Sequence, residues 1–438
     1  MTAFSLGLAS FPLLLVLLAL RLPIGVAMLV VGGGGYMLVN GETALLNYLK
    51  TTPYYLFANY SFSVIPLFLL MGQFATRAGL SESLFRAAYV FLGHRRGGLA
   101  IAGIGGCAGF GAICGSSTAT ASTMGQVALP EMRRYGYSGA LSTGTLAAGG
   151  TLGILIPPSV ILVIYAILTE QNVAAMFLAA FVPAMLAILG FMLAVSVYVR
   201  LFPGEGPSAP KASWKERGRT LLTIWPALAI FLAVIGGIYG GVFTPTEAAA
   251  VGAVATGFLA LLKGGLANGG WKEVLQGTAQ TTAMIFLILL GAEVYSAFLA
   301  MTRMPMEAAS WITAAELSPY LVIGGILLFY LLLGCVMDSL SMILLTIPIL
   351  FPIVSGLDFG LTYEETAIWF GILTVIVVEL GLITPPVGLN VFVINAMAKD
   401  VPMLETFRGV LPFLIAEVVR VVLLVAFPGI VLFALRFA

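Results

Sequence analysis

The chain is poor in charged residues. Of its 438 residues, 9% are Asp, Glu, Lys or Arg, whereas soluble globular domains have about 25%. So few charges cannot cover a surface that faces water. The 60% of residues that are hydrophobic lie in apolar runs of helix length, and such runs disfavour a β-barrel, whose strands alternate apolar and polar residues. The composition therefore predicts an all-α, polytopic membrane protein embedded in a lipid bilayer.

Histidine and cysteine are scarce, and this excludes several classes of function. The single histidine, His94, lies beside Arg95 and Arg96 without a neighbouring acid, and an HExxH zinc protease needs two histidines. The three cysteines lie in apolar segments, which argues against a disulfide framework. A net charge of +1 does not provide the positively charged surface that nucleic-acid binding needs. We therefore expect neither an enzyme nor a nucleic-acid partner, and the chain has no nucleotide-binding loop that could power transport by ATP hydrolysis.

The segment 97–134 has paired arginines at both ends and a polar middle. Arg95-Arg96 precede it and Arg133-Arg134 close it, which places both ends in the cytoplasm under the positive-inside rule. Its most polar part is Gly115-Ser116-Ser117-Thr118. Two full crossings fit poorly in this length. We predict a re-entrant hairpin with its tip near mid-membrane, where non-helical backbone is tolerated only beside a polar site.

Alternation of spans from this hairpin predicts that both termini lie outside. The predicted cytoplasmic loops then hold most of the 20 Lys and Arg residues. The predicted outer segments hold Lys50, Arg303 and Arg436, and Arg420 lies within a span. This distribution agrees with the positive-inside rule and predicts a multi-pass protein with periplasmic termini.

The two halves of the chain resemble each other on either side of a polar loop, 201–219. The run Leu-Gly-Ile-Leu-Ile-Pro-Pro at 152–158 recurs as Leu-Gly-Leu-Ile-Thr-Pro-Pro at 380–386. We therefore predict a first repeat at 1–200, a cytoplasmic linker at 201–219 and a second repeat at 220–438.

Each repeat is predicted to have five transmembrane helices and one re-entrant hairpin. An odd number of crossings inverts the second repeat, so its hairpin, 318–354, must open to the outside. The flanks of that hairpin carry several acids and a single base, Arg303. Inverted repeats with broken helices, here at Pro157-Pro158 and Pro385-Pro386, are typical of secondary transporters.

Two amphipathic stretches, Ser81–Leu92 and Trp271–Gln280, resemble arm helices that lie on the cytoplasmic surface of the membrane. The alternative for each is an extension of a neighbouring span.

Oxygen atoms at the hairpin tips and helix breaks are candidates for binding Na⁺. Proline disrupts the helical ladder and frees carbonyl groups, and oxygen ligands suit a hard cation. The first predicted Na⁺ site comprises Gly115, Ser116, Ser117, Thr118, Thr151, Gly153 and Pro157. The second comprises Asp338, Ser339, Ser341, Leu382, Thr384, Pro385 and Asn390. The predicted substrate contacts are Ser116, Ser117, Ser339, Asn390 and Asn395. The alternative is a pair of kinked helices packed through small residues.

Three acids lie in or beside predicted spans. Asp338 opens the second leg of its hairpin and could be a cation ligand, a proton carrier or the N-cap of that leg. Glu293 and Glu379 could be functional, because acids within membranes usually are, or could tie helices together by a buried hydrogen bond.

Four runs together resemble the large membrane (DctM-type) subunit of tripartite ATP-independent periplasmic (TRAP) transporters. They are G-A-I-C-G-S-S-T-A-T-A-S-T-M at 111–124, G-T-L-G-I-L-I-P-P-S at 150–159, T-P-T-E-A-A-A-V-G-A at 244–253 and L-G-L-I-T-P-P-V-G-L-N at 380–390. The resemblance covers nearly the whole chain.

The resemblance implies an elevator-type fold of the ion transporter superfamily in a bacterial inner membrane. It implies Na⁺-coupled uptake of a carboxylate. It also implies two partners, which are a small four-helix membrane (DctQ-type) subunit and a periplasmic substrate-binding protein (DctP-type). We expect the small subunit to be a separate polypeptide.

Two other functions are weighed against this one. A stand-alone Na⁺/carboxylate symporter of the divalent-anion type would need no partner. An intramembrane hydrolase would need a positioned base, and His94 lies in a predicted cytoplasmic flank. The sequence leaves open which carboxylate is carried.

Overall fold

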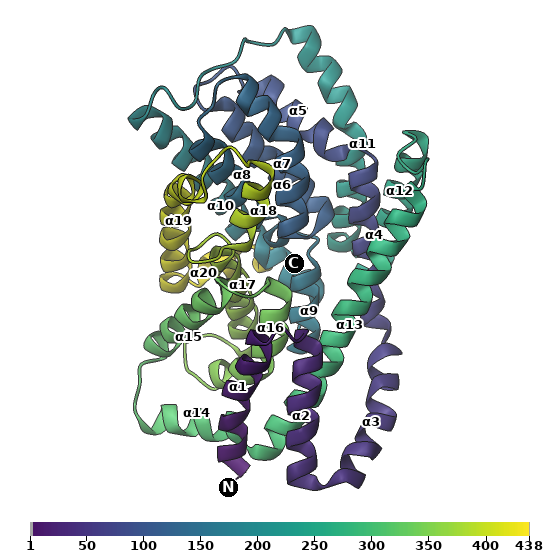
Figure 1. Cartoon of the computed structure of the whole chain (residues 1–438), viewed down its shortest axis with the longest axis vertical. Helices are drawn as coiled ribbons and strands as arrows, with labels where there is room; N and C mark the ends of the chain where they lie inside the picture. Colours follow the sequence, from purple (N-terminus) through teal and green to yellow (C-terminus); the bar gives the residue numbers. More distant parts are fainter. Residues whose placement is uncertain (1–2, 438) are drawn as a thin grey trace.

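The computed structural model describes residues 3–437, which form helices with short connections and contain no β-strand. Figure 1 shows the arrangement. The first half contains α1 (Ala3–Ala19), α2 (Ile24–Asn40), α3 (Glu42–Phe57), η1 (Tyr60–Ser63), α4 (Val64–Arg77), α5 (Leu80–Leu92), α6 (Gly98–Cys114), α7 (Ser117–Arg134), α8 (Gly139–Leu155), α9 (Val160–Leu168) and α10 (Val173–Leu201). The second half contains α11 (Trp214–Tyr239), α12 (Pro245–Leu262), α13 (Gly270–Thr302), α14 (Met304–Ala314), α15 (Pro319–Gly334), α16 (Ser339–Ser355), α17 (Tyr363–Gly381), α18 (Leu389–Met397), α19 (Met403–Ala426), α20 (Gly429–Leu432) and η2 (Phe433–Phe437).

Short polar residues start many of these helices. Ser116, Ser159 and Asp338 are the N-caps of α7, α9 and α16, and each side chain accepts a hydrogen bond from a backbone N–H of the first turn. Thr244 and Thr362 form complete capping boxes with an acid three residues later. Such caps satisfy N–H groups that have no partner within the helix. The local sequence therefore determines where the helices near the middle of the molecule begin.

The order of elements in the first half recurs in the second half. A helix–turn–helix pair, α6–α7, is followed by the interrupted helix α8–α9 and then by α10. The pair α15–α16, the interrupted helix α17–α18 and α19 follow the same order. The two Pro-Pro sequences lie in the interruptions, and both of their peptide bonds are cis.

Five helices are long and apolar enough to cross a membrane: α10, α11, α12, α13 and α19. Two bent pairs can each be one further span, α3 with η1–α4 at 55° and α8 with α9 at 44°. The remaining apolar helices, including α1, α2, α6, α15 and α16, have 10–17 residues. The chain is thus an all-helical protein with several membrane-length helices, and the number of ten crossings stays a prediction.

Some elements differ from the sequence expectation. Trp271–Gln280, expected as a separate surface helix, is the first part of the continuous helix α13. No proline interrupts this stretch, and an ion pair between Arg77 and Glu273 ties it to α4. The structure shows the alternative for this stretch, which is an extension of a neighbouring span. Ser81–Leu92 does form a helix of its own, α5.

Two further boundaries were missed. The apolar pattern gave no helix over 42–57, where α3 lies, because Glu42, Lys50 and several threonines lower the hydropathy there. The apolar residues of the C-terminal part continue to about 434, but α19 ends at Ala426, two residues before Pro428.

Close backbone contacts bring the two halves together. A Cβ atom added to Gly144 of α8 would lie 2.3 Å from the carbonyl carbon of Gly409 in α19. Only glycine permits this approach. In Figure 1, α9 of the first half and α16 of the second half lie side by side near the centre of the molecule. The breaks and hairpin tips of both halves therefore meet in one region.

Candidate functional site

A cavity of about 520 Å³ lies between the tips of the two helix–turn–helix pairs. Its walls come from α4, from the α6–α7 tip, from α9, from α13 and from the α15–α16 tip. The polar side chains in its lining are Gln73, Thr76, Ser116, Ser117, Thr118, Thr281, Asp338 and Ser339. A cavity of this size is typical of sites for small molecules.

The carboxylate of Glu379 joins the two tips. Ser117 Oγ donates a hydrogen bond to Glu379 Oε2, and Ser339 Oγ donates to Glu379 Oε1 at 2.7 Å. Glu379 lies on α17 and is 3% exposed, and both serines are buried. The first tip, the second tip and α17 are thus connected through one acid. Of the two roles weighed for Glu379, the structure shows the hydrogen bond that ties helices together.

Four residues of the first predicted set line the cavity: Gly115, Ser116, Ser117 and Thr118. Gly115 ends α6 with a φ of +66°, a conformation that favours glycine. A Cβ atom added there would lie 3.1 Å from the carbonyl oxygen of Pro158. The first tip therefore packs directly against the break between α8 and α9.

Gly153 lies behind the first tip. A Cβ atom added to Gly153 would lie 2.5 Å from Thr120 Oγ1 and 2.7 Å from the carbonyl oxygen of Ser116. Thr120 is fully buried, and its hydroxyl has no hydrogen-bond partner among the described residues. Two oxygen atoms thus face the position where any other residue would have a side chain.

The second tip repeats this arrangement. Asp338, Ser339 and Leu382 line the cavity. Asp338 accepts a hydrogen bond from the backbone N–H of Ser341 at 3.0 Å, which confirms its N-cap role. The Sγ of Cys335 donates to the carbonyl oxygen of Pro385 at 3.3 Å, so this tip also packs against the break of its own half.

The other predicted residues lie outside the cavity lining. Thr151 Oγ1 and Thr384 Oγ1 donate to carbonyl oxygens of their own helices, those of Ala148 and Leu380. Pro157 lies in the break after α8. Ser341 is buried in the first turn of α16.

The two predicted asparagines differ. Asn390 is fully buried; its Nδ2 donates to the carbonyl oxygen of Ala147 at 3.4 Å, and its Oδ1 has no partner in the part of the chain that the structure describes. Asn395 Nδ2 donates to the carbonyl oxygen of Val401 at 2.8 Å and to Thr406 Oγ1 at 3.2 Å. Asn390 therefore has an unused acceptor close to α8, whereas Asn395 ties the end of α18 to the loop before α19.

No Lys or Arg side chain lines this cavity within residues 3–437. The positive ends of three helices point toward it instead, since Ser117 of α7, Val160 of α9 and Ser339 of α16 are first-turn residues in its lining. A helix N-terminus carries partial positive charge and free N–H groups. The site can therefore accept an anion without a basic side chain, and Asp338 and the hydroxyl oxygens can accept a cation.

Sequence reasoning missed the polar residues on the side of α4 and α13. Gln73 and Thr76 lie on α4, and Thr281 lies on α13. Gln73 directly follows Leu70-Met71-Gly72, a run that is similar to Leu289-Leu290-Gly291 in the second half. The position of Gln73 directly after a repeated run is a signal that could have identified it as a site residue.

Glu293 lies apart from the cavity between the tips. It accepts a hydrogen bond from the Tyr48 hydroxyl at 3.4 Å and lines a separate pocket with residues of α3 and the end of α9. Arg420, the basic residue within a span, pairs with Glu417 in the same helix and donates to the carbonyl oxygen of Pro183 at 3.0 Å. Both groups lie at a distance from the candidate site.

Comparison with known proteins shows a match over most of the chain. The family model described as tripartite ATP-independent periplasmic transporter, DctM component, matches residues 11–430. The C4-dicarboxylate TRAP transporter large permease protein DctM of Pseudomonas aeruginosa is 37% identical over 374 residues, which cover 85% of each chain. The sialic acid TRAP transporter large permease protein SiaM of Vibrio cholerae is 32% identical over 84% of this chain and 85% of its own.

A third relative covers almost the full length. The ectoine/5-hydroxyectoine TRAP transporter large permease protein UehC of Ruegeria pomeroyi is 29% identical over 97% of each chain. Among solved structures, that of the YdaH transporter of Alcanivorax borkumensis matches with a TM-score of 0.65 at 15% identity, covering 89% of this chain and 90% of the other. At this identity the likeness concerns the fold alone.

Proposed function

Because the chain belongs to the family of the DctM component of tripartite ATP-independent periplasmic transporters, we propose that it carries a carboxylate across the membrane together with Na⁺. It is the large permease subunit of such a transporter. The observation that carries the proposal is the cavity between the two tips, which are joined by Glu379. Substrate is bound there, between the hydroxyls and helix N-termini of both tips.

The substrate is an organic acid. The relatives are named for C4-dicarboxylates, sialic acid and ectoine, and all three carry a carboxylate group. In this chain a bound carboxylate faces Ser116 and Ser339 and the N-termini of α7, α9 and α16. The volume of about 520 Å³ is sufficient for molecules of this size.

The charges around the cavity favour coupling to a cation. Asp338 lines it and Glu379 lies behind its serines, whereas no basic side chain lines it in the described range. An anionic substrate is repelled by the carboxylate of Asp338 unless a cation is bound beside it. Bound Na⁺ therefore raises the affinity for the carboxylate, and the carboxylate raises the affinity for Na⁺ by the same factor.

Oxygen atoms near both tips support two Na⁺ sites. For the first, Thr120 Oγ1, which has no hydrogen-bond partner among the described residues, and the carbonyl oxygen of Ser116 lie close together beside Gly153. For the second, the unpaired Oδ1 of Asn390 lies in the break region of the second half, where Asp338 supplies a carboxylate at the tip. Oxygen donors of this kind suit a hard monovalent cation.

The movement that carries substrate is of the elevator type. The two tips, α8–α9 and α17–α18 form one body, and the side of α4 and α13 belongs to a static scaffold. The recurring element order and the packing of each tip against the break of its own half support two inverted repeats. The protein acts in the bacterial inner membrane with a small four-helix subunit and a periplasmic substrate-binding protein.

Reconstitution tests the proposal. The cognate binding protein is first screened by thermal shift with a C4-dicarboxylate, sialic acid and ectoine. Liposomes holding this chain and the small subunit, supplied with the loaded binding protein, should then take up that ligand when Na⁺ is present. Liposomes holding this chain alone should be inactive. Robust uptake of free substrate by this chain alone would favour the stand-alone symporter instead.

A further inference from the structure

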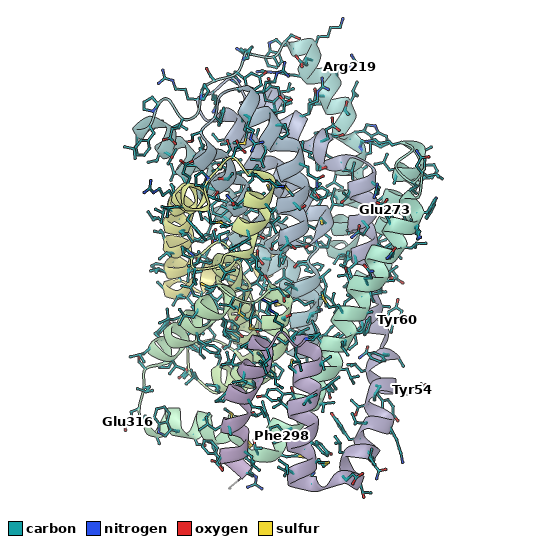
Figure 2. The ribbon with its side chains drawn as sticks, in the orientation of Figure 1. Tyr54, Tyr60, Arg219, Glu273, Phe298 and Glu316 are labelled. Atoms are coloured by element: carbon teal, nitrogen blue, oxygen red, sulfur yellow. The ribbon has the colours of Figure 1, made fainter. Side chains whose placement is uncertain are left out.

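A second polar cavity, of about 500 Å³, lies between α5 and the first turns of α11. Arg86 of α5 forms one side. The other side is a single stretch of α11 and its cap: Ser213, Lys215, Glu216, Arg219, Thr220 and Thr223. Figure 2 shows Arg219 at the end of the molecule opposite Glu316. This cavity is therefore far from the site between the tips.

Its charge is unbalanced. Arg86, Lys215 and Arg219 are three cations, and Glu216 is the one acid in the lining. None of the three cations takes part in an ion pair within the described range. The N-terminus of α11, capped by Ser213, adds partial positive charge at the same place. The cavity is suited to an anion.

The cavity lies where α11 changes from a charged to an apolar helix. Beyond Arg219, the exposed residues Leu221, Leu222 and Trp225 lead into a stretch that is long and apolar enough to span a membrane. Trp214, 79% exposed, lies at the other side of the basic turn. Tryptophans gather at the level of lipid headgroups, so the three cations lie at the depth of the phosphates.

We propose that this cavity binds the phosphate of an anionic phospholipid, with the acyl chains lying along the exposed apolar face of α11. Arg86, Lys215 and Arg219 hold the phosphate. Basic pockets beside membrane helices on the side richer in Lys and Arg bind such headgroups. The adjoining apolar face favours a lipid over a soluble phosphate, which would gain nothing from Leu222 and Trp225.

The bound lipid joins two elements that otherwise meet through few polar contacts. Arg217 lies over the rings of Phe91 in α5 and Trp214 in α11, at 5.6 and 4.8 Å, and is the cationic link between these helices. A phosphate held from both sides adds a second link. Because α5 packs on α6, the first leg of the hairpin, the lipid steadies the connection between that hairpin and α11.

The test is lipid binding to the full chain in detergent, measured by native mass spectrometry with phosphatidylglycerol and phosphatidylethanolamine as probes. The wild type should prefer phosphatidylglycerol. R86Q/K215Q/R219Q should bind it at least tenfold more weakly, with the preference lost. The control K211Q/K263Q/K272Q removes three exposed cations from the same predicted side of the membrane but outside the cavity. It should keep both affinity and preference.

Two results would overturn the proposal. One is equal weakening of phosphatidylglycerol binding by both triple variants, since net charge alone would then explain it. The other is displacement of the lipid by low millimolar inorganic phosphate, which would assign the cavity to a soluble anion. Equal elution volumes and thermal midpoints of the three proteins show that the substituted chains are folded.

Discussion

Glu379 is the residue that connects the two halves at the candidate site. Each of its two carboxyl oxygens accepts a hydrogen bond from one tip, and the donors are the hydroxyls of Ser117 and Ser339. Removing the carboxyl group leaves both buried hydroxyls without a hydrogen-bond acceptor, which lowers the stability of the fold by about 1–3 kcal/mol for each unsatisfied group. The geometry of the cavity therefore depends on this one acid.

Replacing Glu379 by Gln should lower Na⁺-dependent uptake at least tenfold. The side-chain amide keeps the shape but replaces one acceptor oxygen with an N–H donor, so one tip loses its acceptor. E293Q is the matched control, because Glu293 lies in a separate pocket, and it should stay within twofold of the wild type. Equal uptake by both variants would contradict the role of Glu379.

The two serines should also be coupled. S117A and S339A, measured singly and together by uptake and by thermal midpoint, form a double-mutant cycle. Because both hydroxyls share one carboxylate, the effects should be non-additive by about 0.5–3 kcal/mol. Strict additivity would mean that the tips act independently.

Gly153 tests the first Na⁺ site. In G153A the new methyl group would lie 2.5 Å from Thr120 Oγ1 and 2.7 Å from the carbonyl oxygen of Ser116, so both oxygens must move. The Na⁺ concentration for half-maximal uptake should rise at least tenfold. Gly325 of α15 has no atom within 4 Å of an added Cβ, so G325A is the control and should leave that concentration unchanged. An unchanged value in G153A would place Na⁺ elsewhere.

At the scale of elements, each hairpin tip packs against the broken helix of its own half. Gly115 contacts Pro158, and Cys335 contacts Pro385. A tip and its break can thus move as one unit. Figure 2 shows Glu316 and Arg219 at opposite ends of the molecule, which agrees with the predicted placement of 201–219 and of the second hairpin's opening on opposite sides of the membrane.

Labelling of single cysteines should reveal the second hairpin. In a variant without native cysteines, cysteine at Glu316 and cysteine at Asp358 should both react with an impermeant maleimide from the periplasm. Cysteine at Lys211, within the predicted cytoplasmic linker, should react only after the membrane is permeabilised. Reaction of positions 316 and 358 from opposite sides would mean that α15 and α16 together form one crossing of the membrane instead of a hairpin.

Local signals explain which elements the sequence predicted. The segment 97–134 forms the helix–turn–helix pair α6–α7, because Gly97, Ser116 and the closing arginines mark its ends and tip, and its re-entrant course in the membrane stays a prediction. The same holds for 318–354, where Ser318 and Asp338 are N-caps. Helix α3 was missed because its hydropathy is low and none of its residues is buried.

Contacts between distant segments could not be predicted in this way. The bonds from Ser117 and Ser339 to Glu379 span 262 and 40 residues, and no spacing rule relates them. The same applies to the hydrogen bonds of Asn395 with Val401 and Thr406, which link α18 to the start of α19, and its contact with substrate stays a prediction. Sequence reasoning found the parts of the site, and the packing of α17 between the tips decides how they meet.

At the scale of the whole molecule, both halves contribute to one cavity whose lining contains one acid, Asp338, together with hydroxyls and helix N-termini, but no basic side chain within residues 3–437. An anion enters such a site together with cations. We therefore propose that carboxylate uptake is obligatorily coupled to Na⁺.

The most direct test uses proteoliposomes that hold this chain and the small subunit, supplied with the loaded binding protein. Uptake is measured under an inward Na⁺ gradient, and under an inward proton gradient in Na⁺-free buffer with K⁺ replacing Na⁺. We expect uptake in the first condition, its loss when the Na⁺ gradient is dissipated, and none above background in the second. Uptake at equal rate from the proton gradient without Na⁺ would contradict this coupling.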